Sequence, residues 1–176
     1  MALPCRRCRQ NLGRTTHALF HSASTQRLAI VATEASVLAA LDLRSGSISW
    51  RQVRVGCGGR QEQARIDGER APHPPRGAQV LPVGENVTAL QTNGRALLSL
   101  STTAGGAFVR LWSMQGALLW DALLPPAAGG AALPPPAAVF AGPGVVVAWS
   151  DSVTAFDYAA GDVAWCALAP HAPPGG

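Results

Sequence analysis

Short apolar runs separated by polar turn residues follow one another along most of the chain. In VLAALDLRSGSISWRQV (37–53), two such runs flank a Ser-Gly pair, and the second run contains a tryptophan. The same order recurs in LDLRSGSISW (41–50), LWSMQGALLW (111–120) and FDYAAGDVAW (156–165), each with the spacing Gly-x-x-x-Trp. This shared spacing indicates an internal repeat. Its marker residues are Gly46, Trp50, Gly116, Trp120, Gly161 and Trp165.

Each copy of the repeat is predicted to be a β-hairpin. The tripeptides RSG, MQG and AAG end in glycine, which adopts the positive φ of a short hairpin loop without strain. Apolar residues stand five positions before each glycine and two positions before each tryptophan. The residues five positions before the glycines are Leu41, Leu111 and Phe156. The residues two positions before the tryptophans are Ile48, Leu118 and Val163. Because strand side chains alternate between faces, we expect each tryptophan to share a face with the residue two positions before it.

Further apolar runs precede each hairpin, so that each unit contains three or four strands. Two stretches interrupt the period: residues 54–77 are polar and rich in Gly and Pro, and residues 124–136 are of low complexity. Without them the units are about 40–45 residues long, which is typical of a four-stranded propeller blade. The chain is therefore predicted to be all-β, an incomplete β-propeller of about three four-stranded antiparallel blades with quinoprotein-like repeats.

The expected blades cover about 14–53, 78–123 and 137–168, with loops at 54–77 and 124–136 and disordered ends at 1–13 and 169–176. One alternative stays open within the first blade. The segment VATEASVLAALDL is rich in Ala and Leu, and propensity alone permits a helix at 33–41. The equivalent segments of the other copies alternate β-branched and aromatic residues, which favours a strand.

Composition and charge exclude few function classes but disfavour nucleic-acid binding. The chain has 176 residues, of which 48% are hydrophobic and 14% are charged, enough apolar matter for a core. Its net charge of +4 is carried by the first 14 residues, and all 14 basic residues are arginine. They form no basic stripe interleaved with aromatic residues, so we expect no nucleic-acid partner.

The repeat resembles a known family. AALDLRSGSISW (39–50) and TAFDYAAGDVAW (154–165) are similar to the repeat of quinoprotein-type propellers. RQNLGR (9–14) with RLAIVATEASVLAALDLRSGSISWRQV (27–53) resembles the start of the lumenal propeller of subunit 1 of the endoplasmic reticulum (ER) membrane protein complex. The likeness continues to about residue 123 and is looser in the third blade.

The resemblance implies a non-catalytic scaffold subunit on the lumenal side of the ER membrane, in a complex that inserts transmembrane segments of client proteins. Its partners would be the other subunits of that complex, and clients only indirectly, with no cofactor and no small-molecule substrate. Two other interpretations remain: a general propeller adaptor for protein–protein interaction, and a degenerate fragment of a PQQ-type quinoprotein dehydrogenase. Relative to the family pattern the chain lacks a signal peptide and a transmembrane helix and stops after about three blades, so we expect a truncated product. Because an arc of three blades leaves its first and last faces without a covering neighbour, we expect the isolated chain to be marginally stable or insoluble.

Candidates for chemistry are few. Cys5 and Cys8 have zinc-ligand spacing, but no second pair follows, and the other thiols, Cys57 and Cys166, are scattered. The four histidines, His17, His21, His73 and His171, show no metal or catalytic spacing. Asp42 and Asp157 occupy the turn position of the repeat, where a carboxylate accepts turn N–H bonds.

One modification site is present in the sequence. Asn86-Val87-Thr88 forms an N-glycosylation sequon, which has meaning only if the chain reaches the lumen. Asn86 is otherwise expected to begin a strand after the Gly84-Glu85 turn.

Overall fold

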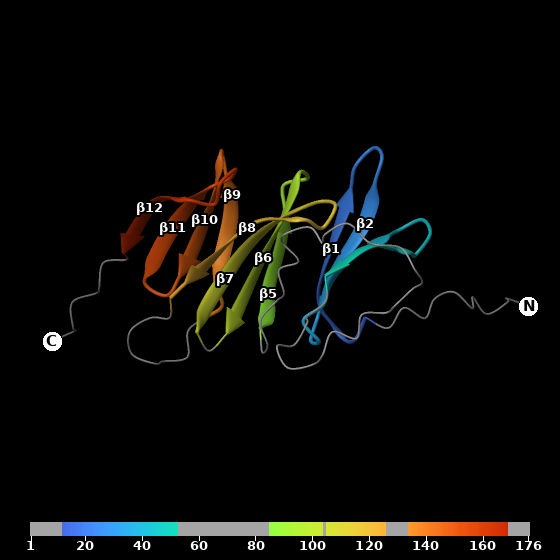
Figure 1. The fold of residues 1–176 in the computed structure, drawn as a ribbon, viewed down its shortest axis with the longest axis horizontal. Coiled ribbons are helices and arrows are strands. Elements are labelled where there is room, and N and C mark those ends of the chain that lie inside the picture. The colour runs from blue at the N-terminus through green and yellow to red at the C-terminus, as the bar shows by residue number, and fades with distance from the viewer. Residues whose placement is uncertain (1–11, 53–84, 104, 126–133, 169–176) are drawn as a thin grey trace, which may run out of the picture.

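The computed structural model describes residues 12–52, 85–103, 105–125 and 134–168. Within these ranges the chain forms three antiparallel sheets of four strands each and no helix. The three sheets follow one another along the longest axis of the molecule, in chain order (Figure 1). The expected all-β, partial-propeller architecture is confirmed.

Each sheet is a simple meander, in which strands adjacent in the sequence pair with one another. The first sheet contains β1 (Thr15–Ser22), β2 (Arg27–Thr33), β3 (Leu38–Asp42) and β4 (Ile48–Gln52). The second contains β5 (Asn86–Thr92), β6 (Ala96–Thr103), β7 (Gly106–Ser113) and β8 (Leu118–Leu124). The third contains β9 (Ala137–Ala141), β10 (Gly144–Trp149), β11 (Ser152–Asp157) and β12 (Val163–Leu168).

The helix left open at 33–41 does not form. Thr33 and Val37 close a tight turn between β2 and β3 through a backbone N–H···O bond of 3.0 Å. Ser36 stands in this turn at a φ of 56°, in the left-handed region. Its hydroxyl donates to the carbonyl of Glu85, so a contact with the second sheet supports the turn. Pairing of β2 with β3 here overrides the helix propensity of the Ala- and Leu-rich segment.

Two apolar clusters fill the space between neighbouring sheets. The first joins buried residues of β2 and β3 to Leu97, Trp112 and Met114 of the second sheet. The second joins the opposite face of the second sheet to Val145, Val147, Trp149 and Phe156 of the third sheet and is continued by partly buried neighbours. A single sheet would leave both faces in water, so burial between sheets supplies the hydrophobic free energy of the fold.

The middle sheet is covered on both faces. Its strand β6 begins with six consecutive buried residues, because alternate side chains enter different clusters. Leu97 points toward the first sheet, whereas Leu98 and Leu100 point toward the third. A strand buried on both sides lacks the alternation of buried and exposed residues that a surface strand shows, although two of the buried residues of β6, Ser99 and Ser101, are polar.

The expectation that each tryptophan shares a face with the residue two positions before it is wrong. In the second sheet Leu111 pairs with Trp120, but the next residue, Trp112, pairs with Leu118, with a register shift between them. Trp120 accordingly joins the cluster facing the third sheet, while Leu118 packs on the cluster facing the first. A β-bulge of this kind inserts one extra residue into a strand and changes which side chains share a face.

The same bulge occurs in the other two sheets. Ala40 pairs with Trp50 and Leu41 with Ile48 in the first sheet. In the third sheet, Ala155 pairs with Trp165 and Phe156 with Val163. The bulge therefore recurs in every copy of the repeat. It places each tryptophan on the opposite face of the sheet from the apolar residue two positions before it.

The alignment of the second copy before its glycine is also wrong by one residue. The hairpin loop is closed by Asp42 N–H to Ser47 O in the first copy and by Asp157 N–H to Asp162 O in the third, but by Ser113 N–H to Ala117 O in the second. The second loop is one residue shorter. Trp112, and not Leu111, is therefore the counterpart of Leu41 and Phe156.

Several expectations fall outside the described residues. These are the disordered ends apart from residues 12–13, the loop at 54–77, and most of the loop at 124–136. Cys5, Cys8, Cys57, His73 and His171 also lie outside them.

Candidate functional site: tryptophan docking contacts between sheets

The marker tryptophans of the first two sheets each lie on the glycine turn of the following sheet. We call this arrangement a docking contact. Trp50, on β4, donates its indole N–H to the carbonyl of Met114 over 2.9 Å. Its ring covers Gly116 so closely that a Cβ on that glycine would lie 2.5 Å from Cδ2 of the indole. The side chain of Gln52 adds a bond of 2.8 Å from Nε2 to the carbonyl of Gly116.

The second docking contact repeats the first between the next two sheets. Trp120, on β8, donates its indole N–H to the carbonyl of Tyr158 over 2.9 Å. A Cβ on Gly161 would lie 2.5 Å from Cγ of the Trp120 ring. The ring also stacks on Phe156, with 5.7 Å between centroids and an interplanar angle of 29°. Such aromatic pairs add to the free energy of area burial.

Glycine meets two requirements at each docking contact. Gly116 and Gly161 have φ values of 85° and 76°, which side-chain-bearing residues adopt only with strain. The indole ring also occupies the space where a Cβ would stand. The Gly-x-x-x-Trp signature thus describes two different contacts: the glycine receives the tryptophan of the preceding sheet, and the tryptophan four positions later is presented to the following sheet.

Aspartate side chains organise the hairpin turns of the first and third copies of the repeat. Oδ1 of Asp157 accepts the backbone N–H groups of Ala159 and Ala160, each over 2.9 Å. In the first sheet Oδ1 of Asp42 accepts the N–H of Ser45 over 2.8 Å and also its hydroxyl. Together with Arg44, these donors hold the pKa of Asp42 below its usual value. The turn role expected for both aspartates is confirmed.

The other two marker residues, Gly46 and Trp165, make no docking contact with another described residue. Gly46 has the same left-handed backbone, with a φ of 68°, but among the described residues no atom lies within 4 Å of the position of its Cβ. Trp165 lies on β12 with 49% of its surface exposed. The described sheets therefore present an empty glycine turn at one end and an undocked tryptophan at the other.

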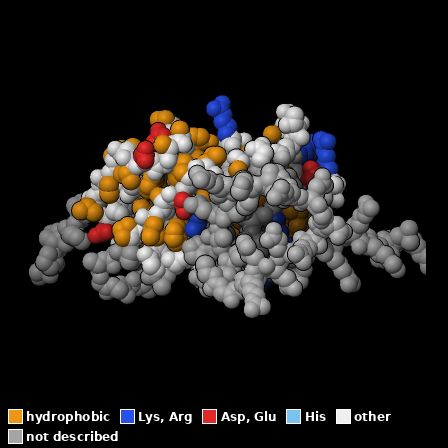
Figure 2. All heavy atoms as spheres, in the orientation of Figure 1, with side chains coloured by type: hydrophobic (Ala, Val, Ile, Leu, Met, Phe, Trp, Pro, Cys, Tyr) orange, Lys and Arg blue, Asp and Glu red, His pale blue; other side chains and the backbone are white. Residues whose placement is uncertain are grey.

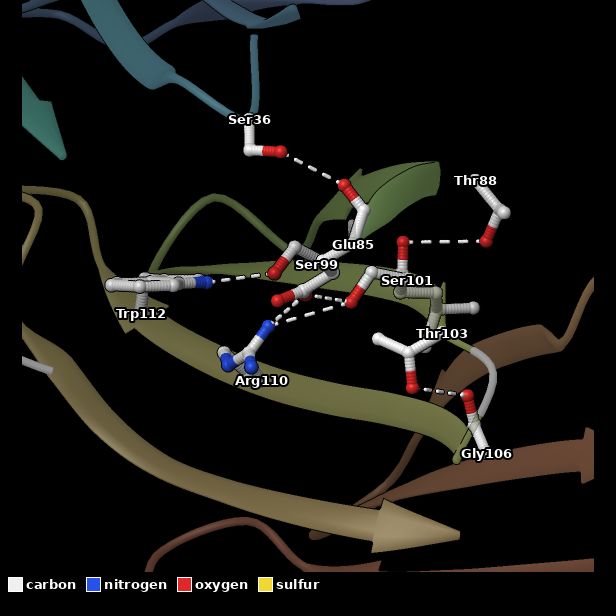
Figure 3. A network of polar contacts seen from close by, with 10 residues as sticks. Ser36, Glu85, Thr88, Ser99, Ser101, Thr103, Gly106, Arg110 and Trp112 are labelled. Atoms are coloured by element: carbon white, nitrogen blue, oxygen red, sulfur yellow. Dashed lines mark hydrogen bonds and ion pairs between the residues drawn. The ribbon is translucent and has the colours of Figure 1, made fainter. Parts of the chain in front are cut away.

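Sequence reasoning missed a buried ion pair within the second sheet, on the side that meets the first sheet. Arg110, on β7, and Glu85, which precedes β5, are both buried and form a salt bridge through Nη1 and Oε1 (Figure 3). The hydroxyl of Ser101 donates to the same carboxylate oxygen, and Ser36 of the first sheet donates to the Glu85 carbonyl over 2.9 Å. The signal in the sequence was an arginine inside the apolar run AFVRLW.

The network contributes to packing rather than exposing reactive groups. The Arg110 guanidinium also lies 4.4 Å from the centre of the Phe108 ring, a favourable cation–π position. Nearby, the Trp112 indole donates to the hydroxyl of Ser99 over 2.8 Å. These contacts satisfy most polar groups on the face of the second sheet that meets the first sheet, whereas Oε2 of Glu85 is buried without a hydrogen-bond partner among the described residues.

Groups suited to metal or acid–base chemistry are sparse in the described part of the chain. No group of three or more His, Cys, Asp or Glu side chains there is arranged to hold a metal ion. A hollow of about 360 Å³ lies between turns of the second and third sheets, with Arg95, Asp157 and Tyr158 among its lining residues. Cys166 is a free, exposed thiol on β12, and Asn86 begins β5 with its side chain exposed.

The described ranges also contain no helix with the length and apolar character needed to span a membrane.

Comparisons with known proteins agree with this geometry. The solved structure of BamB from Moraxella catarrhalis matches with a TM-score of 0.51 and 17% sequence identity, over 86% of this chain and 39% of that one. The chain thus spans about two fifths of that protein's length, and the likeness shows the fold alone. A search of curated protein sequences found no match. The profile described as the EMC1 N-terminal beta-propeller domain matches residues 8–173. Because that match covers nearly the whole chain, the chain belongs to the EMC1 N-terminal β-propeller family.

Proposed function

We propose that this chain is a non-catalytic scaffold part of the ER membrane protein complex, placed on its lumenal side. The observation that carries the proposal is the family match over residues 8–173. Family members serve a complex that inserts transmembrane segments of client proteins into the ER membrane. The partners of this chain are then the other subunits, and clients are contacted only indirectly.

The use of the marker residues supports a scaffold role. Trp50 and Trp120 are engaged in docking contacts through both their rings and their N–H groups. The charged pair Glu85 and Arg110 is buried where the first two sheets meet. These side chains hold sheets together, which is the work of a platform for other proteins rather than of a reaction centre.

Affinity purification from cells tests the proposal. The full chain, tagged and directed to the ER lumen, is expected to co-purify with the other subunits of the complex. Trp120→Ala, which empties a docking contact, is expected to reduce that recovery. Asp121→Ala changes the exposed neighbour on the same strand and is expected to leave it unchanged. A folded chain that recovers none of these subunits, or that recovers only unrelated proteins, contradicts the proposal in favour of a general adaptor.

Glycosylation of Asn86 reports the compartment. Asn86, whose side chain is exposed, is the first residue of β5, an edge strand of the second sheet. In the lumen-directed chain we expect a glycosidase-sensitive mass shift that Asn86→Gln abolishes and Thr88→Ser preserves. Protease protection in microsomes separates an unused sequon from a chain that does not reach the lumen.

The absence of catalysis is tested by supplying the cofactor and metal ion of a quinoprotein dehydrogenase. The purified chain with pyrroloquinoline quinone and calcium is expected to show no dye-linked oxidation of alcohols or sugars. Turnover that depends on both additions would overturn the scaffold proposal in favour of a quinoprotein dehydrogenase.

A further inference from the structure

The hollow between the second and third sheets is lined by three hairpin turns. Asn93 and Arg95 belong to the turn between β5 and β6, Gly142 and Pro143 to the turn between β9 and β10, and residues 157–159 to the turn between β11 and β12. Its volume is about 360 Å³. The two sheets pack on each other through a shared apolar cluster, so the hollow is formed by described residues alone.

Local hydrogen bonds fix the turns around the hollow. Oδ1 of Asn93 accepts two backbone N–H groups of its own turn, over 3.0 and 2.9 Å. The N–H of Tyr158 donates to the carbonyl of Pro143 over 3.0 Å and so ties the two turns of the third sheet together. The Tyr158 carbonyl in turn accepts the Trp120 indole N–H. The walls of the hollow are therefore preformed, which reduces the entropy lost on binding.

Opposite charges line the hollow from the two sheets. The Arg95 guanidinium comes from the second sheet and the Asp157 carboxylate from the third. No ion pair joins them, and among the described residues the Arg95 side chain has no hydrogen-bond partner. Asp157 uses Oδ1 for two N–H groups of its turn, and its Oδ2 has no partner in the described ranges. One wall of the hollow is therefore positive and the other negative.

The polar groups of the hollow are not required by the repeat. Arg95 has Thr25 and Pro143 as its counterparts in the equivalent turns of the other sheets. Tyr158 stands where the second sheet has Met114, since both carbonyls accept an indole N–H. On the face of the molecule shown in Figure 2, hydrophobic side chains cover much of the third sheet, with few charged side chains among them. A preformed hollow with a few convergent polar groups is typical of a binding site.

We infer that the hollow binds an extended segment of another protein in which an acidic and a basic side chain stand two positions apart. Such side chains project from the same side of an extended backbone. The acidic side chain pairs with Arg95, because the planar guanidinium matches a carboxylate, and the basic side chain pairs with Oδ2 of Asp157. The Tyr158 hydroxyl and the Asn93 amide N–H groups add neutral hydrogen bonds.

The pairing of charges also excludes other ligands. A group with several charges of one sign, such as a phosphate, is attracted by one wall and repelled by the other. A segment with one charge of each sign is attracted by both. This inference concerns a surface of the chain and does not depend on the proposed function.

A peptide titration followed at Tyr158 tests the inference on the purified full chain. Tyr158 is the only tyrosine in the sequence, so isotope-labelled tyrosine gives NMR signals from the hollow alone. The probes are the blocked pentapeptides Ala-Glu-Ala-Lys-Ala and Ala-Lys-Ala-Glu-Ala. We expect at least one of them to shift the signal saturably, at about millimolar affinity. Its forms with Gln in place of Glu, or Met in place of Lys, are expected to bind about three- to tenfold more weakly.

Each substitution in the hollow is expected to affect one charge of the peptide. Arg95→Gln removes the positive wall, so that replacing Glu by Gln in the peptide has little further effect. Asp157→Asn keeps the acceptor of its turn and removes the negative wall, so that replacing Lys by Met has little further effect. Arg27→Gln and Asp121→Asn make the same charge changes at exposed positions on other strands and are expected to bind like the wild type. Circular dichroism verifies that every variant is folded.

Four results would overturn the inference. The first is a Tyr158 signal that neither peptide moves up to its solubility limit. The second is equal binding of the charged and the neutral peptides. The third is an equal loss in Arg95→Gln and Arg27→Gln, which would indicate a general effect of net charge. The fourth is saturable binding of inorganic phosphate or free glycine where neither peptide binds, which would assign the hollow to a small ion or zwitterion. The proposed scaffold function is tested separately, by recovery of other subunits.

Discussion

The indole of Trp120 lies directly over the α-carbon of Gly161, so that a Cβ on Gly161 would stand 2.5 Å from the ring. Trp120 lies on β8, the last strand of the second sheet, and Gly161 lies in the last hairpin turn of the third sheet. Trp50 and Gly116 have the same relationship one sheet earlier. The contact is therefore the unit by which one blade is attached to the next.

Gly161→Ala is expected to destabilise the fold. The left-handed backbone costs an alanine about 1–2 kcal/mol, and the clash with the indole adds about 1–3 kcal/mol of overpacking. Gly142→Ala is the control, because its φ is also positive but the space around it is open, so only the backbone part is expected. Urea unfolding of both variants measures the difference. Equal free energies of unfolding would contradict the docking role of Gly161.

Equivalent tryptophans are expected to differ in their contribution to stability. Trp120 is buried and hydrogen-bonded, so Trp120→Ala is expected to lower the free energy of unfolding by about 3–5 kcal/mol. Trp165 is half exposed, and Trp165→Ala is expected to change it by less than about 1 kcal/mol in dilute solution. The two variants are compared by urea unfolding at low protein concentration. Similar losses would show that Trp165 is docked in the single chain.

The indole hydrogen bond can be separated from the ring contact. Trp120→Phe keeps an aromatic ring over Gly161 but leaves the Tyr158 carbonyl without its donor. We expect a loss of about 1 kcal/mol on this account, because the acceptor is only partly buried and the net worth of such a hydrogen bond is modest. The loss should be smaller than that of Trp120→Ala in the same urea titration. A loss as large as that of the alanine variant would mean that the hydrogen bond carries the whole contact.

Substitutions of Glu85 and Arg110 are expected to have coupled effects on the free energy of unfolding. Arg110→Leu leaves a buried carboxylate without its counter-charge and is expected to destabilise the fold by about 3–5 kcal/mol. The double variant Glu85→Leu/Arg110→Leu removes both charges and is expected to recover most of that loss. A double-mutant cycle by chemical denaturation measures the coupling. Additive losses in the two single variants would contradict it.

Asp42 is expected to make stability depend on pH in the acid range. The N–H and hydroxyl of Ser45, with Arg44, lower its pKa in the folded chain. The ionised form therefore favours the folded state above the unfolded pKa of about 3.9, and this contribution disappears as the pH falls through the lower folded value. Asp42→Asn keeps a side-chain acceptor without a charge that titrates.

Thermal unfolding across the acid range checks this prediction. The difference in melting temperature between wild type and Asp42→Asn is expected to be constant above about pH 5 and to shrink below about pH 3.9. A difference that grows on acidification would have the wrong sign and would exclude this role for the carboxylate.

The sequence by itself determined the local elements. The Gly-x-x-x-Trp spacing and the turn residues were enough to place the hairpins around Gly46, Gly116 and Gly161, because a hairpin loop depends on backbone freedom within a few residues. The aspartates of the first and third turns were also assigned correctly, since their hydrogen bonds reach only two or three residues along the chain.

Only the tertiary structure decided which faces meet. A bulge of one residue, invisible in an alternating pattern, sends Leu118 and Trp120 to opposite faces, and the shorter second loop makes Trp112 the counterpart of Phe156. The ion pair of Glu85 and Arg110 likewise joins residues whose sequence surroundings do not indicate each other. Local turn chemistry acts over a few residues, whereas the partner of each docked tryptophan is selected by packing against the next sheet, 64 residues further along the chain for Trp50 and 38 for Trp120.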